Sequence, residues 1–436
     1  MQKSNHLIIK KYLEKHSLVE SNVISFNNFI ERRMQEIVDE ISESIEIDEF
    51  EIKLGKISVG MPKVIEADGS SSLITPAEAK LRNLTYAAPI NLELTVRKDD
   101  QVDSETVEIG KIPIMVRSNR CNTKGMSKEE LIANYNDPLD PGGYFIIKGN
   151  ERVMVMAEDL AENQPFIENN SKGDLTLKVF SLKGTYRIPT LISENKEGIF
   201  EISFSRFKNL PAIVVLKALG LTKESDIAKY LEKETDSVIV NLYEYVNLAT
   251  KEDAMMYLAE LSSLQGTKKE ILDRVKQRID SYLFPHIGNK KEDRMKKAIT
   301  LCKLIKKFLT AKENPQLRTD KDHYSNKRVR LSGDLLADLF RVNLNILIRY
   351  IQHSLQKIQK RKKFYSLKTI AKSTLFTHRI ESSIATGNWI GERTGVTQNM
   401  DKTNYLAILS QLQRVSSSLP GEQENFLART LHPTHY

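Results

Sequence analysis

Residues 90–97, Ile-Asn-Leu-Glu-Leu-Thr-Val-Arg, alternate apolar and polar side chains without interruption. A period of two is typical of a β-strand with one buried face. The acidic stretch 99–105 follows and is predicted to form a turn, after which 107–116 is predicted to be the partner strand.

A second hairpin is predicted farther along the chain. Residues 137–143, Asp-Pro-Leu-Asp-Pro-Gly-Gly, are dense in turn formers and precede an apolar run at 144–147. A Lys-Gly-Asn turn at 148–150 then leads to a second run at 152–156.

Helical periods occupy much of the remaining chain. In 21–44 apolar residues recur every three or four positions, which predicts an amphipathic helix with a core-facing stripe. Thr75 followed by Pro76 and Glu78 predicts a capped helix start. The stretch 223–312 is mostly helical in pattern. Further helices are predicted at 270–283, at 295–309 and from Asp334 to about Lys363.

The helix at 295–309 places apolar side chains on one stripe and lysines off it. We expect the lysines to lie on a solvated face, and a binding face stays open as the alternative. The stripe comprises Met295, Ile299, Cys302, Ile305 and Leu309, and the lysines are Lys296, Lys297, Lys303, Lys306 and Lys307. Together these patterns predict an α+β fold. The length of 436 residues predicts more than one domain.

Composition limits the function classes. The formal net charge is +8, which favours a polyanionic partner if the charge is clustered. No run of about eighteen apolar residues and no secretory pattern occurs, so a soluble, cytoplasmic protein without a membrane partner is expected. Cys121 and Cys302 are isolated in sequence, which predicts two reduced thiols rather than a zinc site or a disulfide.

Motifs of catalysis are missing from the sequence. There is no Gly-Lys-Ser/Thr phosphate loop, no His-Glu-x-x-His and no Gly-x-Ser-x-Gly. His432 and His435 offer two imidazoles with no third ligand near them. The sequence therefore predicts no catalytic residue, no metal site and no cofactor in this chain.

The segment 386–436 mixes basic and amide side chains in a way that suits contacts to phosphate, sugar and base edges. Polar loops are common, so composition alone leaves a structural role open. The candidate nucleic-acid-binding residues are Gln398, Arg393, Lys402, Asn404, Arg414 and Arg429, among further polar residues such as Asn388, Gln411 and Gln413.

Four colinear stretches are specific enough to indicate a family. They read EAKLRNLTY at 78–86, DPGGYFI at 140–146, DHYSNKRVRLSGDLL at 322–336, and ATGNWIG at 385–391 followed by RTGVTQ at 393–398, DKTN at 401–404 and RVSS at 414–417. The chain resembles the N-terminal part of the second-largest subunit of archaeal-type multisubunit DNA-directed RNA polymerases.

The resemblance implies a discontinuous domain layout. A protrusion would comprise 1–150 plus 325–388, an inserted helix-rich lobe 151–324, and a fork 389–436. The sequence patterns alone place breaks near 150 and 325. The family continues beyond the equivalent of Tyr436 into hybrid-binding and wall regions. The end of the sequence at Tyr436 could reflect either a gene that is split in two or a truncated chain, and both explanations stay open.

The resemblance also implies a role in positioning template DNA, downstream DNA and nascent RNA. The implied partners are the largest polymerase subunit, other core subunits, the remaining C-terminal half of this subunit, and the nucleic acids. The catalytic Mg²⁺ is expected in the largest subunit. Gln398 is expected to face RNA, with Arg414 and Arg429 in its supporting wall.

The chain departs from the family pattern at a few positions. Gln413 replaces an arginine that usually precedes Arg414, which removes one fixed cation. Asn399 and Gln411 stand where the bacterial rifamycin pocket typically has an aromatic residue and a histidine. We therefore expect weak or no rifamycin binding. Micromolar binding of the drug to the assembled enzyme would contradict this expectation.

A second function class remains open. A scaffold or regulatory protein could have the same protrusion and lobe and act through protein contacts only. The two hypotheses differ in whether the same genome encodes the missing C-terminal half, in this gene or an adjacent one.

Overall fold

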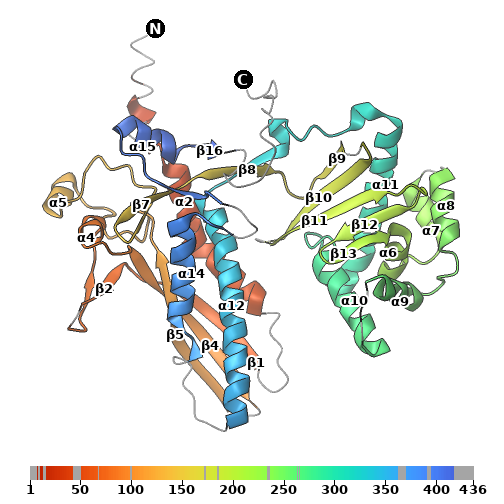
Figure 1. Cartoon of the computed structure of the whole chain (residues 1–436), viewed down its shortest axis with the longest axis horizontal. Coiled ribbons are helices and arrows are strands. Elements are labelled where there is room, and N and C mark those ends of the chain that lie inside the picture. Colours follow the sequence, from red (N-terminus) through yellow and green to blue (C-terminus); the bar gives the residue numbers. More distant parts are fainter. Residues whose placement is uncertain are drawn as a thin grey trace. The chain divides into compact units, whose positions relative to one another are not determined.

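The computed structural model of the chain describes residues 7, 10–12, 16–42, 51–66, 68–98, 101–170, 173–183, 186–232, 236–262, 264, 266–361, 370–389 and 394–416. The chain forms two compact units. Unit 1 comprises Met1–Asp159 and Val329–Ala428, and unit 2 comprises Leu160–Arg328 and Arg429–Tyr436. Both units combine helices with sheets, so the fold is α+β as predicted (Figure 1).

Unit 1 is organised around an antiparallel sheet of order β1-β4-β5. Its strands are β1 (Glu51–Val59), β4 (Ala87–Lys98) and β5 (Gln101–Pro113). The apolar residues of the alternating stretch are buried as predicted. The predicted acidic turn at 99–105 is wrong over 101–105, because pairing continues to Lys98 and Gln101. Polar side chains such as Asp103 are exposed there. An antiparallel pair of strands can have a face in water, so acidic residues can be part of the strand.

Helices pack against this sheet. The predicted helix at 21–44 is present as α2 (Glu20–Asn28), a π-helical turn η1 (Phe29–Arg33) and α3 (Met34–Ser42). Its predicted stripe, from Phe26 to Ile41, is buried. The long predicted helix is α12 (Ser332–Arg361), and it lies beside α14 (Ser373–Thr386) in unit 1 (Figure 1). α3 contacts β1, and α14 contacts β5.

Shorter elements complete unit 1. The second predicted hairpin is present as β6 (Phe145–Ile147) and β7 (Asn150–Met154). Thr75 caps α4 as predicted, because its side chain accepts a hydrogen bond from the Glu78 amide at 3.3 Å. The other elements are α4 (Pro76–Leu81), α5 (Lys128–Ala133), β2 (Lys63–Ile65), β3 (Ser71–Leu73), β15 (Thr397–Asn399), α15 (Tyr405–Leu412) and β16 (Val415–Ser416), with β8 (Met156–Leu160) and β14 (Lys327–Arg330) at the unit boundary.

Unit 2 pairs a five-stranded antiparallel sheet with helices. The strands are β9 (Pro165–Asn169), β10 (Leu175–Lys183), β11 (Tyr186–Glu194), β12 (Phe200–Phe204) and β13 (Phe207–Pro211). Predicting only a helix-rich region here was incomplete, partly because Pro189 interrupts the strand pattern of β11 and proline is rare inside strands.

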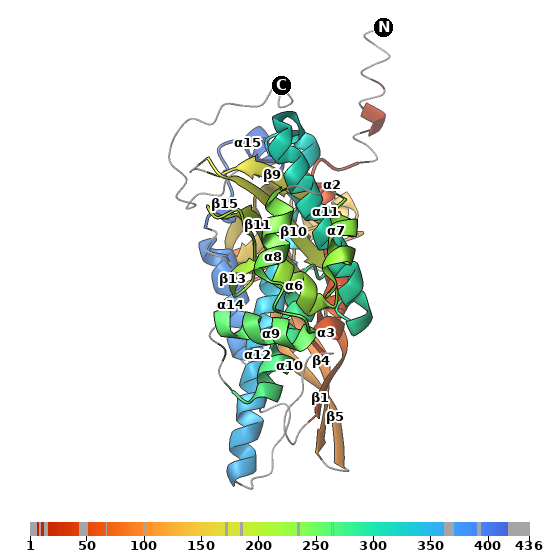
Figure 2. The same cartoon turned by 90° about the vertical axis from the view of Figure 1, so that its right-hand side faces the viewer.

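The helices of unit 2 cover one face of that sheet (Figure 2). α6 contacts β12 and β13, and α11 contacts β9 and β10. The helices are α6 (Ala212–Leu219), α7 (Glu224–Leu231), α8 (Asp236–Glu244), α9 (Lys251–Leu261), α10 (Lys268–Tyr282) and α11 (Arg294–Glu313), with short 3₁₀ turns η2 (Lys291–Asp293), η3 (Pro315–Leu317) and η4 (Tyr324–Asn326).

The predicted orientation of α11 is wrong at its first turn. Met295, predicted to be buried, is 43% exposed, whereas Lys297, predicted to be solvated, is fully buried. The Lys297 ammonium donates to the carbonyl oxygens of Ile279 at 3.3 Å and Asp280 at 2.7 Å. These are carbonyls of the last turn of α10, so the lysine neutralises the negative end of that helix.

The buried Lys297 predicts a pH dependence of stability. Burial lowers the pKa of Lys297 from 10.5 to about 8. Between these values the unfolded chain binds the proton more tightly, so the contribution of Lys297 to the unfolding free energy rises with pH. We expect the difference between the wild type and Lys297→Met to increase by on the order of 2 kcal/mol from pH 8 to pH 10.

Chemical denaturation at several pH values measures this difference. Lys296→Met is the matched control, because the Lys296 side chain is 70% exposed and belongs to the same helix turn. A wild-type advantage that stays flat or falls over that pH range would contradict the buried position of the ammonium.

Both cysteines are free and buried. Burial raises the pKa of the Cys302 thiol to about 12, so this thiol stays protonated and unreactive at neutral pH. Over the described residues, none of the helices has the length and apolar character needed to cross a membrane.

Candidate nucleic-acid interface

The segment with most of the predicted contact residues is built on the hairpin β6–β7 of unit 1. β15 pairs antiparallel with β7 and places Gln398 opposite Val153. The buried Thr397 donates its hydroxyl to the Ile384 carbonyl of α14 at 2.6 Å. Because side chains alternate along a strand, Gln398 points away from that buried side and is partly exposed.

A buried carboxylate fixes the chain that follows β15. Glu151 forms ion pairs with Lys80 at 2.6 Å and with Lys402 at 2.5 Å. Its carbonyl also accepts a hydrogen bond from the Met400 amide at 3.1 Å. The Glu151 side chain is 6% exposed, whereas that of Lys402 is 64% exposed. Glu151 therefore holds Lys402 in place and leaves most of that side chain in water.

The charge state of Glu151 follows from its surroundings. Burial raises the pKa of its carboxyl, but the hydrogen bonds and positive charges of Lys402 and Lys80 outweigh burial, and the net pKa is lowered. Glu151 is therefore ionised at neutral pH and attracts both ammonium groups.

The ion pairs extend into a longer chain of contacts. The Lys80 ammonium donates to the Tyr144 hydroxyl at 2.9 Å, and that hydroxyl donates to Asp140 at 2.5 Å. We call Asp140, Tyr144, Lys80, Glu151 and Lys402 the Glu151 network. It joins the stretches 78–86, 140–146 and 401–404, which are far apart in sequence.

Amide side chains order the turn into α15. The Asn404 side-chain oxygen accepts from the Ala407 amide at 2.7 Å and caps this helix. Gln411 accepts from the Asp401 amide at 2.8 Å and donates to the Asn399 carbonyl at 2.9 Å. Gln411 is buried and both groups of its amide bond the backbone, so its role is internal.

Arg414 lies at the end of this segment and is exposed. The neighbouring Gln413 donates its side-chain amide to the Leu18 carbonyl at 3.0 Å. β16 then pairs with β8 in parallel, with Val415 opposite Met156. Within the described part of the chain no carboxylate forms an ion pair with Arg414. The hydroxyl and amide of Thr403 lower the pKa of Asp401, and the charge of Arg414 adds a smaller effect.

Four of the six predicted contact residues therefore lie on one ordered segment, 398–414. They are Gln398, Lys402, Asn404 and Arg414. Arg393, Arg429, His432 and His435 lie outside the described residues. The described ranges contain no group of three or more His, Cys, Asp or Glu side chains that could hold a metal ion.

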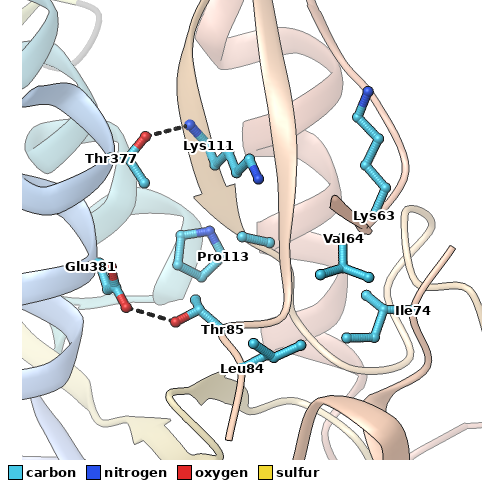
Figure 3. A pocket seen from close by; sticks show the side chains of 10 residues that line it. Lys63, Val64, Ile74, Leu84, Thr85, Lys111, Pro113, Thr377 and Glu381 are labelled. Carbon is cyan, nitrogen blue, oxygen red and sulfur yellow. Dashed lines mark hydrogen bonds between the residues drawn. The ribbon is translucent and has the colours of Figure 1, made fainter. Parts of the chain in front are cut away.

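Figure 3 shows a cavity of about 220 Å³ elsewhere in unit 1, lined by residues of β2, the β4–β5 hairpin and α14. On one wall, Glu381 accepts a hydrogen bond from the Thr85 hydroxyl at 2.7 Å, and Thr377 accepts one from the Lys111 amide at 2.9 Å. Apolar residues such as Ile74 line the other wall. The lining residues include one carboxylate, that of Glu381, and no histidine or cysteine.

Family comparisons match almost the entire chain. The family model described as RNA polymerase beta subunit matches residues 17–378, and the model described as RNA polymerase Rpb2, domain 3, matches residues 398–436. The chain belongs to the RNA polymerase beta-subunit family. The second match begins at Gln398, where the segment that the Glu151 network holds also begins.

Curated relatives refine the position within this family. The chain is 38% identical to DNA-directed RNA polymerase subunit Rpo2N of Halobacterium salinarum over 100% of this chain and 88% of the relative. It is 36% identical to the Rpo2N subunit of Methanocaldococcus jannaschii over 98% and 89%. It is 38% identical to the Rpo2 subunit of Saccharolobus solfataricus over 98% of this chain but only 39% of that relative. The chain thus corresponds to the N-terminal part of the archaeal second-largest subunit.

Sequence reasoning missed two residues that organise this member of the beta-subunit family. Glu151 followed a predicted turn and had no distinguishing pattern. Asn22 is buried, donates to the Leu412 carbonyl at 3.4 Å and accepts from the Ser332 hydroxyl through its own carbonyl at 3.1 Å. A polar residue on the apolar stripe of the first helix was the available signal for Asn22.

Proposed function

We propose that this chain positions template DNA, downstream DNA and nascent RNA as the N-terminal portion of the second-largest subunit of DNA-directed RNA polymerase. One observation carries the proposal. Glu151 and β7 fix the segment 398–414 so that Gln398, Lys402 and Arg414 reach the surface. Cations and amides held on a fixed backbone suit phosphate and base contacts.

The family layout can be assigned to these units as part of the proposal. Unit 1 would contain most of the protrusion, predicted at 1–150 and 325–388, and the fork, predicted at 389–436, as far as Ala428. Unit 2 would contain most of the lobe, predicted at 151–324, whereas residues 151–159 of that range, with most of β7, belong to unit 1. In this assignment the fork strand β15 extends a hairpin of the protrusion.

The partners follow from the same proposal. The chain would assemble with the largest polymerase subunit, other core subunits and the C-terminal half of its own subunit in the cytoplasm. We place the catalytic Mg²⁺ in the largest subunit. The contribution of this chain is then electrostatic positioning and strand separation rather than acid–base chemistry.

Purification of the tagged chain from its source cells tests the assignment to a polymerase. We expect the other large polymerase subunit to co-purify in stoichiometric amounts. Recovery of the chain without that subunit would favour the scaffold hypothesis and remove the proposed role.

The contact residues make a separate prediction. Arg414→Ala in the assembled polymerase should shorten the lifetime of the elongation complex about three- to tenfold and lower the slope of its salt dependence by about one. Gln398→Ala should have a smaller effect that depends little on salt, because an amide carries no charge. Neither change should unfold the chain, since both side chains reach solvent.

Arg318→Ala and Gln316→Ala serve as matched controls, because both residues are exposed in unit 2. A lifetime that Arg414→Ala leaves unchanged across a salt series would contradict the proposed contact. If Arg318→Ala shortened the lifetime of the elongation complex as much as Arg414→Ala, the effect would come from the net charge of the chain rather than from a contact of Arg414.

A further inference from the structure

A small polar pocket lies in unit 2, apart from the proposed interface. Its volume is about 280 Å³. At about 30 Å³ per water molecule in the liquid, this accommodates a tetrahedral anion with part of its hydration shell. The pocket lies between the β12–β13 turn and the last turns of α10. Its lining includes Ser205, Arg206, Phe207, Gln277, Arg278 and Ser281.

Among the described residues, no carboxylate neutralises the positive charge of the pocket. Over the described ranges neither Arg206 nor Arg278 forms an ion pair, and no carboxylate lines the pocket. Acidic residues of the same helix are engaged elsewhere. Asp280 pairs with Arg294 at 2.5 Å, and Asp273 pairs with Lys276 at 3.3 Å.

The Arg278 guanidinium is held before any ligand arrives. It lies over the ring of Phe207, with 5.4 Å between its central carbon and the ring centroid. Phe207 is 1% exposed and packs against the ring of Phe204 at 5.2 Å, so this support is fixed. A stacked guanidinium keeps its N–H groups for an acceptor and loses less conformational entropy on binding.

The helix end would ordinarily oppose an anion at this position. Gln277, Arg278 and Ser281 lie near the C-terminus of α10, where the helix dipole is negative. Here the buried Lys297 ammonium bonds the Ile279 and Asp280 carbonyls and offsets that partial charge. The two arginines therefore dominate the local field.

We infer that this pocket binds a phosphate group. Two guanidinium groups supply bidentate, charge-assisted hydrogen bonds to its oxygens. The hydroxyls of Ser205 and Ser281 and the amide of Gln277 supply further neutral donors. The phosphate comes either from a free phosphomonoester or from the diester backbone of a nucleic acid, and the pocket chemistry is common to both.

Isothermal titration calorimetry on the full chain tests the phosphate site. The probes are inorganic phosphate, AMP as a monoester, and the dinucleotide TpT, whose single phosphate is a backbone diester. We expect at least one probe to bind with a Kd in the millimolar range or tighter. Arg278→Gln should weaken that binding about tenfold, because a charge-assisted bidentate contact is lost.

Lys276→Gln is the matched control, because it removes the same charge from the same helix outside the pocket. Arg206 lies on the exposed β12–β13 turn, outside α10. Arg206→Gln should therefore also weaken phosphate binding, and it tests the site without altering that helix. Binding of inorganic phosphate or AMP without binding of TpT would assign the site to a free ligand, and binding of TpT would assign it to nucleic acid. Absence of binding by every probe, or equal weakening by Lys276→Gln, would overturn the inference. The outcome does not depend on the proposed role of 398–414.

Discussion

Replacing Glu151 by leucine is expected to lower the unfolding free energy of unit 1 by about 2–3 kcal/mol, because it leaves the Lys80 ammonium without its carboxylate partner. The Lys80 side chain is 31% exposed, so solvent screens part of this cost. The local effect should be larger around β15. The Met400 amide, which bonds the Glu151 carbonyl, should lose protection from hydrogen exchange.

Two matched variants separate the parts of this effect. Lys402→Met removes the exposed member of the Glu151 network and should cost under about 1 kcal/mol. Glu151→Gln keeps the shape and removes the charge, so it should lie between the two. Two results together would show that the Glu151 network does not hold the segment 398–414. The Glu151→Leu variant would have the same denaturant midpoint of unfolding as the wild type, and the hydrogen exchange of its Met400 amide would be unchanged.

The lowered pKa of Glu151 gives the same contact a pH signature. A carboxylate with a lowered folded-state pKa contributes stability above its ordinary value of 4.5 and loses it as the pH falls through the folded-state value. The wild-type advantage over Glu151→Gln should therefore be constant near neutrality and decline below pH 4.5.

Gly333→Ala is expected to destabilise unit 1 by about 3 kcal/mol through overpacking. A Cβ atom at Gly333 would lie 2.2 Å from the Ser25 carbonyl oxygen and 2.6 Å from its hydroxyl oxygen. The Ser25 carbonyl belongs to the backbone of α2, so it cannot rotate away as a side chain could. Because alanine is the better helix former, a loss of stability would identify the steric contact as its cause.

Gly55→Ala is the control for this substitution. Its added Cβ would lie 2.7 Å from a carboxylate oxygen of Glu93, which can rotate away, and 3.0 Å from the Glu93 Cβ, which would have to shift slightly. We expect a change below about 1 kcal/mol, measured by denaturant unfolding. Equal stability of Gly333→Ala and the wild type would show that α2 and α12 are not packed this closely.

Many helices and strands could be predicted from the sequence because local interactions determine them. The cap at Thr75 satisfies an amide three residues away, so a short sequence window contains the whole interaction. The strand at 90–97 and the stripe from Phe26 to Ile41 depend only on periodicity. These features were predicted because their cause lies within a few residues.

Long-range contacts explain what could not be predicted. Lys297 is buried because two carbonyl oxygens of another helix accept hydrogen bonds from its ammonium group, and no periodicity in α11 contains that information. The position of Lys402 depends on Glu151, which lies in strand β7, far from Lys402 in the sequence. Gln411 fits a surface pattern in sequence, yet its partners are the backbone of Asp401 and Asn399.

Site-specific cross-linking tests the central claim that 398–414 faces nucleic acid. A photoreactive amino acid at position 398 or 414 would be introduced into the assembled polymerase, and elongation complexes with labelled RNA and DNA would then be irradiated. Position 128 is the control, because Lys128 is an exposed residue of α5. We expect labelled RNA or DNA to be cross-linked from 398 and 414 and not from 128. Cross-links to protein alone from both positions would contradict the account.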